Sequence, residues 1–136
     1  MKKRGFTLVE LLAVIVILTI IVIIALPVVY NGVVDSKKDY LISQTKRVHT
    51  EAESRFKSGN TIKVISSEDD TKLDGFDSKL KYCVYLNDEG YVVDIKVSDG
   101  EWITTLGDDQ SIKDLNEENV EKGNLDNYKC KSYGEE

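Results

Sequence analysis

An apolar run near the N-terminus is the feature that most limits what this chain can fold into. From Leu11 to Val34 the sequence holds 24 residues without a charge, most of them Val, Ile or Leu. At a rise of 1.5 Å per residue, the stretch from Leu11 to Tyr30 makes a helix of about 30 Å, which matches the hydrocarbon core of a bilayer. We therefore expect a transmembrane helix, and any soluble fold has to be built from the residues after it.

The residues around this run decide between a cleaved secretory signal and a retained span. A secretory signal has an apolar region of only about 7–15 residues and a small-x-small cleavage site. Here the run is longer, and Ala25-Leu26-Pro27 does not supply such a site. The basic residues Lys2, Lys3 and Arg4 precede the run. The positive-inside rule therefore places the N-terminus in the cytoplasm and everything beyond Tyr30 outside it.

Two residues of this segment need an explanation. Glu10 places a carboxylate at its start, although a charge at the centre of a bilayer costs about 2.5–3.5 kcal/mol on insertion scales. Pro27 is the one proline of the chain. Because it has no N–H for the carbonyl of Ile23, it predicts a kink or a helix end. Membrane helices tolerate such kinks where neighbouring helices or local adjustments satisfy the freed carbonyl.

The N-terminus combines a basic leader ending in Gly5 with Phe6-Thr7-Leu8-Val9-Glu10 and then the apolar run to Pro27. This combination resembles the class III signal of type IV prepilins and pseudopilins. The resemblance implies that a membrane prepilin peptidase cuts between Gly5 and Phe6 and methylates the new N-terminal Phe6. It also implies that Pro27 marks a bend or a melted segment in the filament.

The resemblance also implies a role for Glu10. Cleavage creates a cationic amine on Phe6, and in the family the carboxylate at this place pairs with the amine of a neighbouring subunit. At about 4 Å and an effective dielectric near 20, such a pair gains roughly 4 kcal/mol before desolvation. An unpaired buried carboxylate carries the penalty instead, so Glu10 is expected to direct assembly and register. The alternative is a Glu10 that snorkels to the interface of a plain single-pass anchor.

The same resemblance divides the chain into three parts. Residues 1–5 are expected to be a leader peptide, residues 6–34 a transmembrane and filament-core helix, and residues 35–136 an exported globular head. This last part carries 15 Lys/Arg against 23 Asp/Glu. Its acidity argues against a nucleic acid partner, because phosphate binding needs a basic face.

The head is expected to begin with an amphipathic helix over residues 35–58 that continues from the span. Gly59-Asn60 is a typical stop for it. A coiled-coil partner is the competing explanation for the apolar stripe of this helix, but sustained heptads are lacking, so packing on the chain's own sheet is expected. The stripe falls within about 80° of a helical wheel and consists of Val34, Leu41, Thr45, Val48, Ala52 and Phe56.

Residues 79–106 predict the sheet, because apolar and polar residues alternate in KLKYCVYLN, YVVDIKVS and EWITTL. Turn sequences at Asp88-Glu89-Gly90 and Asp99-Gly100 separate the three segments. We expect an antiparallel meander whose one face covers the helix stripe, while the other face meets solvent. In its second strand the apolar face would consist of Tyr91, Val93, Ile95 and Val97. The expected fold class is therefore α+β, with a long helix packed on a small meander. The resemblance to type IV pilins implies the same arrangement.

Two shorter elements and a loop complete the expected head. TIKVIS at residues 61–66 predicts a short strand, and Ser111-x-x-Asp114 the start of a short helix that ends before Gly123. Residues 107–136 are otherwise expected to form a C-terminal loop region.

Cys83 and Cys130 are the two cysteines of the chain. Export permits oxidation and an even count fits one bridge, although two unpaired thiols remain the alternative. In many pilins a comparable bridge closes the C-terminal loop, and here it would tie residues 107–130 back across the sheet. Two cysteines and the lone His49 are too few ligands for zinc, and His49 is expected to be solvated among polar neighbours.

Neither a catalytic set nor a metal site can be assembled from the sequence. It holds one His and no G-x-S-x-G or phosphate-binding glycine loop. The acidic stretch from Asp70 places Lys72 and Lys81 where a calcium loop needs oxygen ligands, and Asp108-Asp109 fits a solvated turn. We therefore expect no enzyme, no metal and no cofactor.

A filament subunit is the function that these features favour. Its expected partners are the prepilin peptidase, the pilus assembly machinery, copies of itself and other pilins, with the membrane bound through residues 6–34. It would be stored in the cytoplasmic membrane and then moved into an extracellular pilus that serves adhesion or motility. Between Leu11 and Val29 only Ala13 and Ala25 are small. Because close helix packing in membranes prefers small residues, this slightly favours a minor pilin or a pseudopilin over a major, filament-building pilin.

Two alternatives remain at this point. A pseudopilin of a type II secretion or DNA-uptake system would use the same N-terminus. A single-pass anchored extracytoplasmic binding module would instead keep its uncut N-terminus and be indifferent to Glu10.

Overall fold

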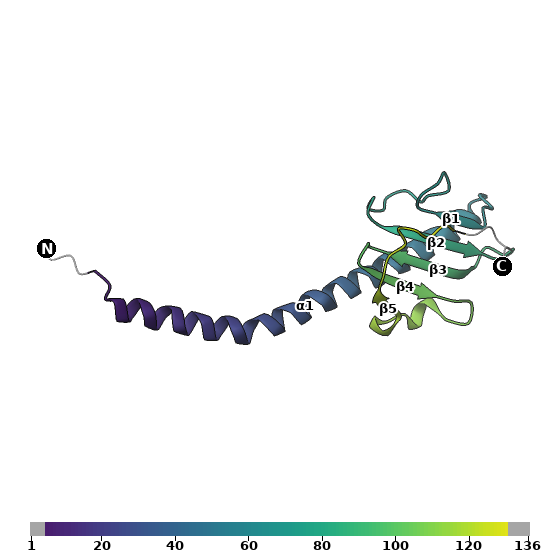
Figure 1. Ribbon diagram of the computed structural model, residues 1–136. Helices are drawn as coiled ribbons and strands as arrows, with labels where there is room; N and C mark the ends of the chain where they lie inside the picture. Colours follow the sequence, from purple (N-terminus) through teal and green to yellow (C-terminus); the bar gives the residue numbers. More distant parts are fainter. Residues whose placement is uncertain (1–4, 131–136) are drawn as a thin grey trace. The chain divides into compact units, whose positions relative to one another are not determined.

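The computed structural model of the protein describes residues 5–130 (Figure 1). The chain divides into two units, residues 1–36 and 37–136, which are taken separately below. The long helix and the sheet make this an α+β fold, as expected. In chain order the elements are α1 (Leu8–Lys57), β1 (Val64–Ser66), β2 (Lys81–Leu86), β3 (Val92–Ser98), β4 (Trp102–Leu106), the 3₁₀ turns η1 (Ile112–Asp114) and η2 (Glu117–Asn119), and β5 (Val120–Lys122).

The first unit holds the N-terminal half of α1, which presents its apolar side chains outward all round. Each large apolar side chain from Leu8 to Val33 is about half exposed or more. Pro27 lies within the helix rather than at its end. The hydroxyls of Thr19 and Ser36 donate to the carbonyls of Ile15 and Gly32 at 2.7 and 2.8 Å. These bonds satisfy polar groups within the helix itself, as an apolar environment requires.

In the second unit, the C-terminal half of α1 supplies one wall of the core. Leu41, Thr45, Val48 and Ala52 are fully buried at helical spacing, which confirms the central part of the expected stripe, while Phe56 is half-buried. The hydroxyl of Thr45 donates to the Leu41 carbonyl at 2.8 Å, so this buried polar group is paired. Fully burying a Leu or Val side chain contributes about 1.5–3 kcal/mol. The packing therefore holds α1 firmly against the sheet.

The sheet has five antiparallel strands in the order β1-β2-β3-β4-β5. The meander of β2, β3 and β4 and the short strand β1 were expected from the sequence. The inner face of the sheet carries buried residues that lie opposite one another on neighbouring strands. Val84 pairs with Ile95, Ile95 with Leu106, and Val97 with Thr104.

Strand β5 corrects the expectation that residues 107–136 are only loops. Val120 pairs with Thr104 and Lys122 with Trp102, so the fifth strand extends the edge of β4. Three residues are too short for an alternation to be recognised in the sequence, and the strand exists because the open edge of β4 offers a partner. The helix expected from Ser111 is reduced to the single turns η1 and η2.

Tyr91 is a second correction. The ladder between β2 and β3 shifts register between Tyr85 and Leu86, so that Leu86 lies opposite Val92. Tyr91 therefore falls outside the strand and is 51% exposed. The expected inner face is correct for Ile95 and Val97, which are fully buried, whereas Val93 is only half-buried. A bulge shifts the side chains on one side of it to the opposite face of the sheet, so simple alternation assigns them to the wrong face. The sequence pattern gave no sign of this bulge.

The outer face of the sheet is partly covered rather than open to solvent. Residues 123–130 return across it after β5 (Figure 1). Beneath them Cys83 and Ser98 are 3% and 0% exposed, and Leu125 of the returning segment is itself buried. The hydroxyl of Ser98 donates to the Gly123 carbonyl at 3.4 Å. The expectation of a solvated outer face is therefore wrong at this part of the sheet.

Candidate functional site

The residues of the expected cleavage site lie just before the helix. Gly5, Phe6 and Thr7 have no helical backbone, and α1 begins at Leu8. The side chain of Phe6 is 92% exposed. The peptide bond between Gly5 and Phe6 is thus accessible and not part of a hydrogen-bonded helix.

Glu10 closes a reciprocal pair of hydrogen bonds with Thr7. The backbone N–H of Thr7 donates to Oε2 of Glu10, and the backbone N–H of Glu10 donates to Oγ1 of Thr7, both at 3.2 Å. The N–H of Leu11 donates to the Thr7 carbonyl at 3.2 Å, which is the first bond of the helix. Thr7 is therefore the N-cap residue of a capping box.

This capping box was not predicted from the sequence, although the pattern T-x-x-E at residues 7–10 is typical of one. It gives Glu10 a local task, because the carboxylate satisfies one of the free N–H groups of the helix start. A negative charge there also interacts favourably with the helix dipole. A test of the expected assembly role must therefore separate the charge of Glu10 from its capping bond.

The first half of α1 is long and apolar enough to cross a membrane. None of this apolar stretch is buried against the rest of the protein. Apolar surface of this extent is unfavourable in water, at about 25 cal/mol per Å². This part of the chain therefore needs lipid or other helices around it. Pro27 lies inside the same segment.

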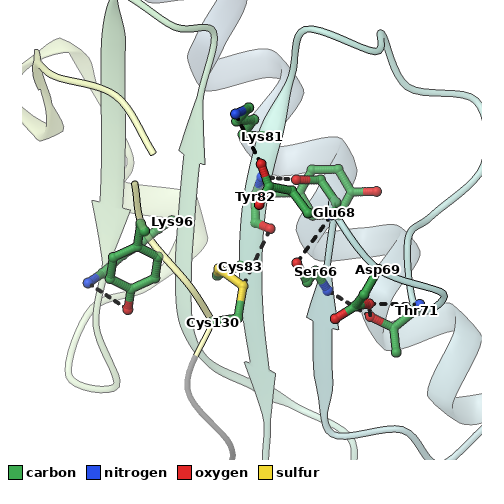
Figure 2. The surroundings of a disulfide bond; sticks show 11 residues. Ser66, Glu68, Asp69, Thr71, Lys81, Tyr82, Cys83, Lys96 and Cys130 are labelled. Atoms are coloured by element: carbon green, nitrogen blue, oxygen red, sulfur yellow. Dashed lines mark hydrogen bonds and ion pairs between the residues drawn. A yellow bond between two sulfur atoms is a disulfide. The ribbon is translucent and has the colours of Figure 1, made fainter. Parts of the chain in front are cut away.

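In the head, a disulfide joins Cys83 of β2 to Cys130 (Figure 2). Their Cα atoms are 5.6 Å apart and 47 residues apart in sequence. The pairing agrees with the one that the resemblance implies. Because Cys83 lies on the outer face of the sheet, the bridge fixes the end of the returning segment to the middle of β2.

Contacts of two lysines, Lys81 and Lys96, lie near the disulfide (Figure 2). Lys81 pairs with Glu68 at 3.0 Å and with Asp126 at 3.2 Å. The hydrogen bonds to Glu68 and Asp126 raise the pKa of Lys81. The ammonium of Lys96 lies 4.6 Å from the ring centroid of Tyr128. These contacts connect the returning segment both to the sheet and to the loop before β2.

His49 corrects another expectation, because its side chain is only 15% exposed rather than solvated. Its Nε2 lies 3.7 Å from Oε1 of Glu53, and that oxygen also accepts from the backbone N–H of Val92 at 3.2 Å. Burial lowers the pKa of His49, and the Glu53 carboxylate opposes this shift. His49 thus belongs to the contact between α1 and β3.

An open groove of about 630 Å³ runs between α1 and the loop before β2. Arg47 lies over the ring of Phe76, with its guanidinium 4.8 Å from the ring centroid. Acidic and basic side chains alternate around the groove, among them Asp39, Lys46, Glu51 and Asp74. This mixture gives the groove no strong charge of one sign.

Comparison with known proteins bears on the N-terminus alone. The family model of the prokaryotic N-terminal methylation motif matches residues 1–26. This motif is the class III prepilin signal of type IV pilins and pseudopilins. The chain thus begins as a type IV pilin-like or pseudopilin precursor does. No curated protein and no solved structure matches the chain.

Proposed function

We propose that this protein is a structural subunit of a type IV pilus, without enzymatic activity. A prepilin peptidase cuts it after Gly5 and methylates Phe6. The mature chain, which begins at Phe6, is stored in the membrane, and the assembly machinery then moves it into an extracellular filament that serves adhesion or motility.

One observation carries this proposal: the methylation motif over residues 1–26 includes the start of a long helix whose large apolar side chains from Leu8 to Val33 are about half exposed or more. A plain anchor needs an apolar surface only towards lipid. A filament subunit needs the same surface twice, first against lipid and then against the helices of its neighbours. The motif supports the second use, because a simple anchor requires no cleavage site.

Glu10 supplies the charge that favours docked subunits over isolated ones. Cleavage leaves a cationic amine on Phe6, and the carboxylate of Glu10 in a neighbouring subunit is its partner. At about 4 Å and an effective dielectric near 20, the pair gains roughly 4 kcal/mol before desolvation. Pro27 contributes differently, because its missing N–H weakens the helix locally and permits a bend in the packed filament core.

The head completes the subunit. Its disulfide and the contacts of Lys81 fasten the returning segment, so the outer surface of the head keeps its form outside the cell. Between Leu11 and Val29 only Ala13 and Ala25 are small, and close packing of many identical helices prefers small residues. This composition slightly favours a minor pilin or a pseudopilin over a major pilin.

Shearing intact cells tests the proposal against a pseudopilin and against an anchored module. A pilus subunit is expected in the sheared, high-molecular-weight fraction together with other pilins. Retention of the processed chain in the membrane fraction would favour a pseudopilin of a secretion or DNA-uptake system. Retention of an unprocessed chain would favour the anchored module.

A further inference from the structure

The peptide bond that the proposed function requires to be cut lies two residues before the first helical residue. Gly5, Phe6 and Thr7 are non-helical, and Leu8 begins α1. Exposed segments outside helices and strands are preferred sites of proteolytic cleavage. A helix that started one turn earlier would enclose this bond in helical backbone and would use the Gly5 carbonyl as an internal hydrogen-bond acceptor. The position of the helix start therefore decides whether the bond can be cut.

Two hydrogen bonds fix this position. Thr7 Oγ1 accepts from the N–H of Glu10, and the N–H of Thr7 donates to Glu10 Oε2, both at 3.2 Å. An N-cap residue has an extended backbone by nature. As long as Thr7 caps the helix, the residues before it are therefore directed away from helical geometry. Replacing a Thr cap by an apolar residue disfavours the capped state roughly two- to thirty-fold.

We propose that Thr7 is a positioning residue for prepilin processing. With Glu10 it holds the start of α1 at Leu8 and keeps the Gly5–Phe6 bond extended for the peptidase. The inference rests on the proposed function, since it presupposes the cut. In that step water adds across the bond, the Gly5 carbonyl carbon becomes a carboxylate, and the amine of Phe6 takes the proton.

The same geometry separates two tasks of Glu10. A glutamine at this place keeps a side-chain acceptor for the Thr7 N–H, because Gln serves in a capping box as Glu does. Processing is therefore expected to tolerate Glu10→Gln. The charge of Glu10, in contrast, matters only for the later pairing between subunits.

The test compares Thr7→Val with Thr7→Ser in the full-length chain. Valine keeps the branched shape and removes the hydroxyl, whereas serine keeps the hydroxyl. Each variant is incubated in membrane vesicles of its own host, and the fraction of cut chain is followed over time by mass spectrometry. We expect Thr7→Val to be cut about three- to tenfold more slowly than wild type, and Thr7→Ser at the wild-type rate. Equal rates for Thr7→Val and Thr7→Ser would overturn the inference.

A double variant distinguishes the helix start from a direct contact between the hydroxyl and the peptidase. Proline is favoured at the first helical position and forces the residue before it out of helical geometry. The side chain of Leu8 is 83% exposed, so a proline ring there displaces no packed neighbour. Thr7→Val with Leu8→Pro is therefore expected to be cut at nearly the wild-type rate. If this double variant stays as slow as Thr7→Val, the hydroxyl acts on the peptidase itself and the positioning role is wrong.

The failures of the two proposals are distinguishable. A wild-type chain that is never cut contradicts the proposed function. A wild-type chain that is cut, with Thr7→Val cut equally fast, contradicts only the role of Thr7.

Discussion

A Cβ atom at Gly90 would lie 2.2 Å from Cδ1 of Phe56. The turn between β2 and β3 thus approaches the end of α1 so closely that no side chain fits between them. Gly90 also has a φ of +87°, which L-residues rarely adopt. One residue therefore satisfies two requirements, a left-handed backbone and a close approach to a ring.

Gly90→Ala is expected to lower the free energy of unfolding of the head by about 2–4 kcal/mol, because backbone strain and overpacking add. Gly75→Ala is the matched control, since Gly75 has a φ of +85° and nothing within 4 Å of a Cβ. Gly75→Ala is expected to lower the free energy of unfolding by only about 1 kcal/mol, because it adds backbone strain without overpacking. Denaturant unfolding of the full chain in detergent measures both. Equal decreases in the free energy of unfolding for the two variants would show that the ring of Phe56 does not exclude a side chain at position 90.

Removing the disulfide is expected to destabilise the head by about 4 kcal/mol, because the bridge between Cys83 and Cys130 closes a long loop. The double variant Cys83→Ala, Cys130→Ala should unfold at a lower denaturant midpoint than wild type and should no longer respond to a reductant. A wild-type midpoint that is unchanged by reductant would contradict this expectation.

His49 is expected to make the head less stable as the pH falls. Its pKa in the folded state is lowered from 6.5, mainly by burial. Its contribution to stability is therefore complete above pH 6.5 and is lost as the pH falls towards the folded pKa.

Burial raises the pKa of Asp94, and the nearby Lys96 ammonium opposes this shift. Its effect has the opposite sign, because stability from that group is lost as the pH rises through its folded pKa.

His49→Gln tests this assignment by denaturant unfolding between pH 7.5 and 5 (values chosen to bracket the unperturbed His pKa of about 6.5). The variant is expected to lose stability less steeply than wild type over this window. Parallel pH profiles for the two proteins would mean that other groups cause the dependence.

The charge and the capping bond of Glu10 can be separated with two substitutions. Glu10→Ala removes both, whereas Glu10→Gln removes only the charge. If the pair between subunits directs assembly, both variants should enter filaments at least about tenfold less than wild type, since even 1.4 kcal/mol corresponds to a factor of ten. The amount of each variant in the sheared filament fraction, relative to the amount cut, is the measurement. Normal incorporation of Glu10→Gln would leave capping as the only role of Glu10.

Much of the fold could be predicted from the sequence, because it depends on local periodicity. The stripe of Leu41, Thr45, Val48 and Ala52 indicated the packed half of α1, and alternation indicated β2, β3 and β4. The capping box at Thr7 was also readable, since its pattern lies within four residues. The same carboxylate also fits the prepilin signal, so the sequence gives Glu10 two compatible roles.

The remaining features depend on tertiary contacts that periodicity does not contain. Strand β5 forms because the edge of β4 offers a partner. Cys83 and Ser98 are buried because a segment distant in sequence crosses the sheet. His49 is mostly buried beside Glu53, whose carboxylate accepts from the N–H of Val92 on β3. Each of these depends on two parts of the chain meeting, which neither part specifies alone.

The N-terminus of the protein purified from its own host membranes tests the central claim most directly. Mass spectrometry of the intact chain and of its N-terminal peptide reports where the chain begins and whether its amine is modified. Our account predicts a chain that begins at a methylated Phe6. A chain that still begins at Met1 or Lys2 would contradict it, and the protein would then be a membrane-anchored module whose Glu10 only caps a helix.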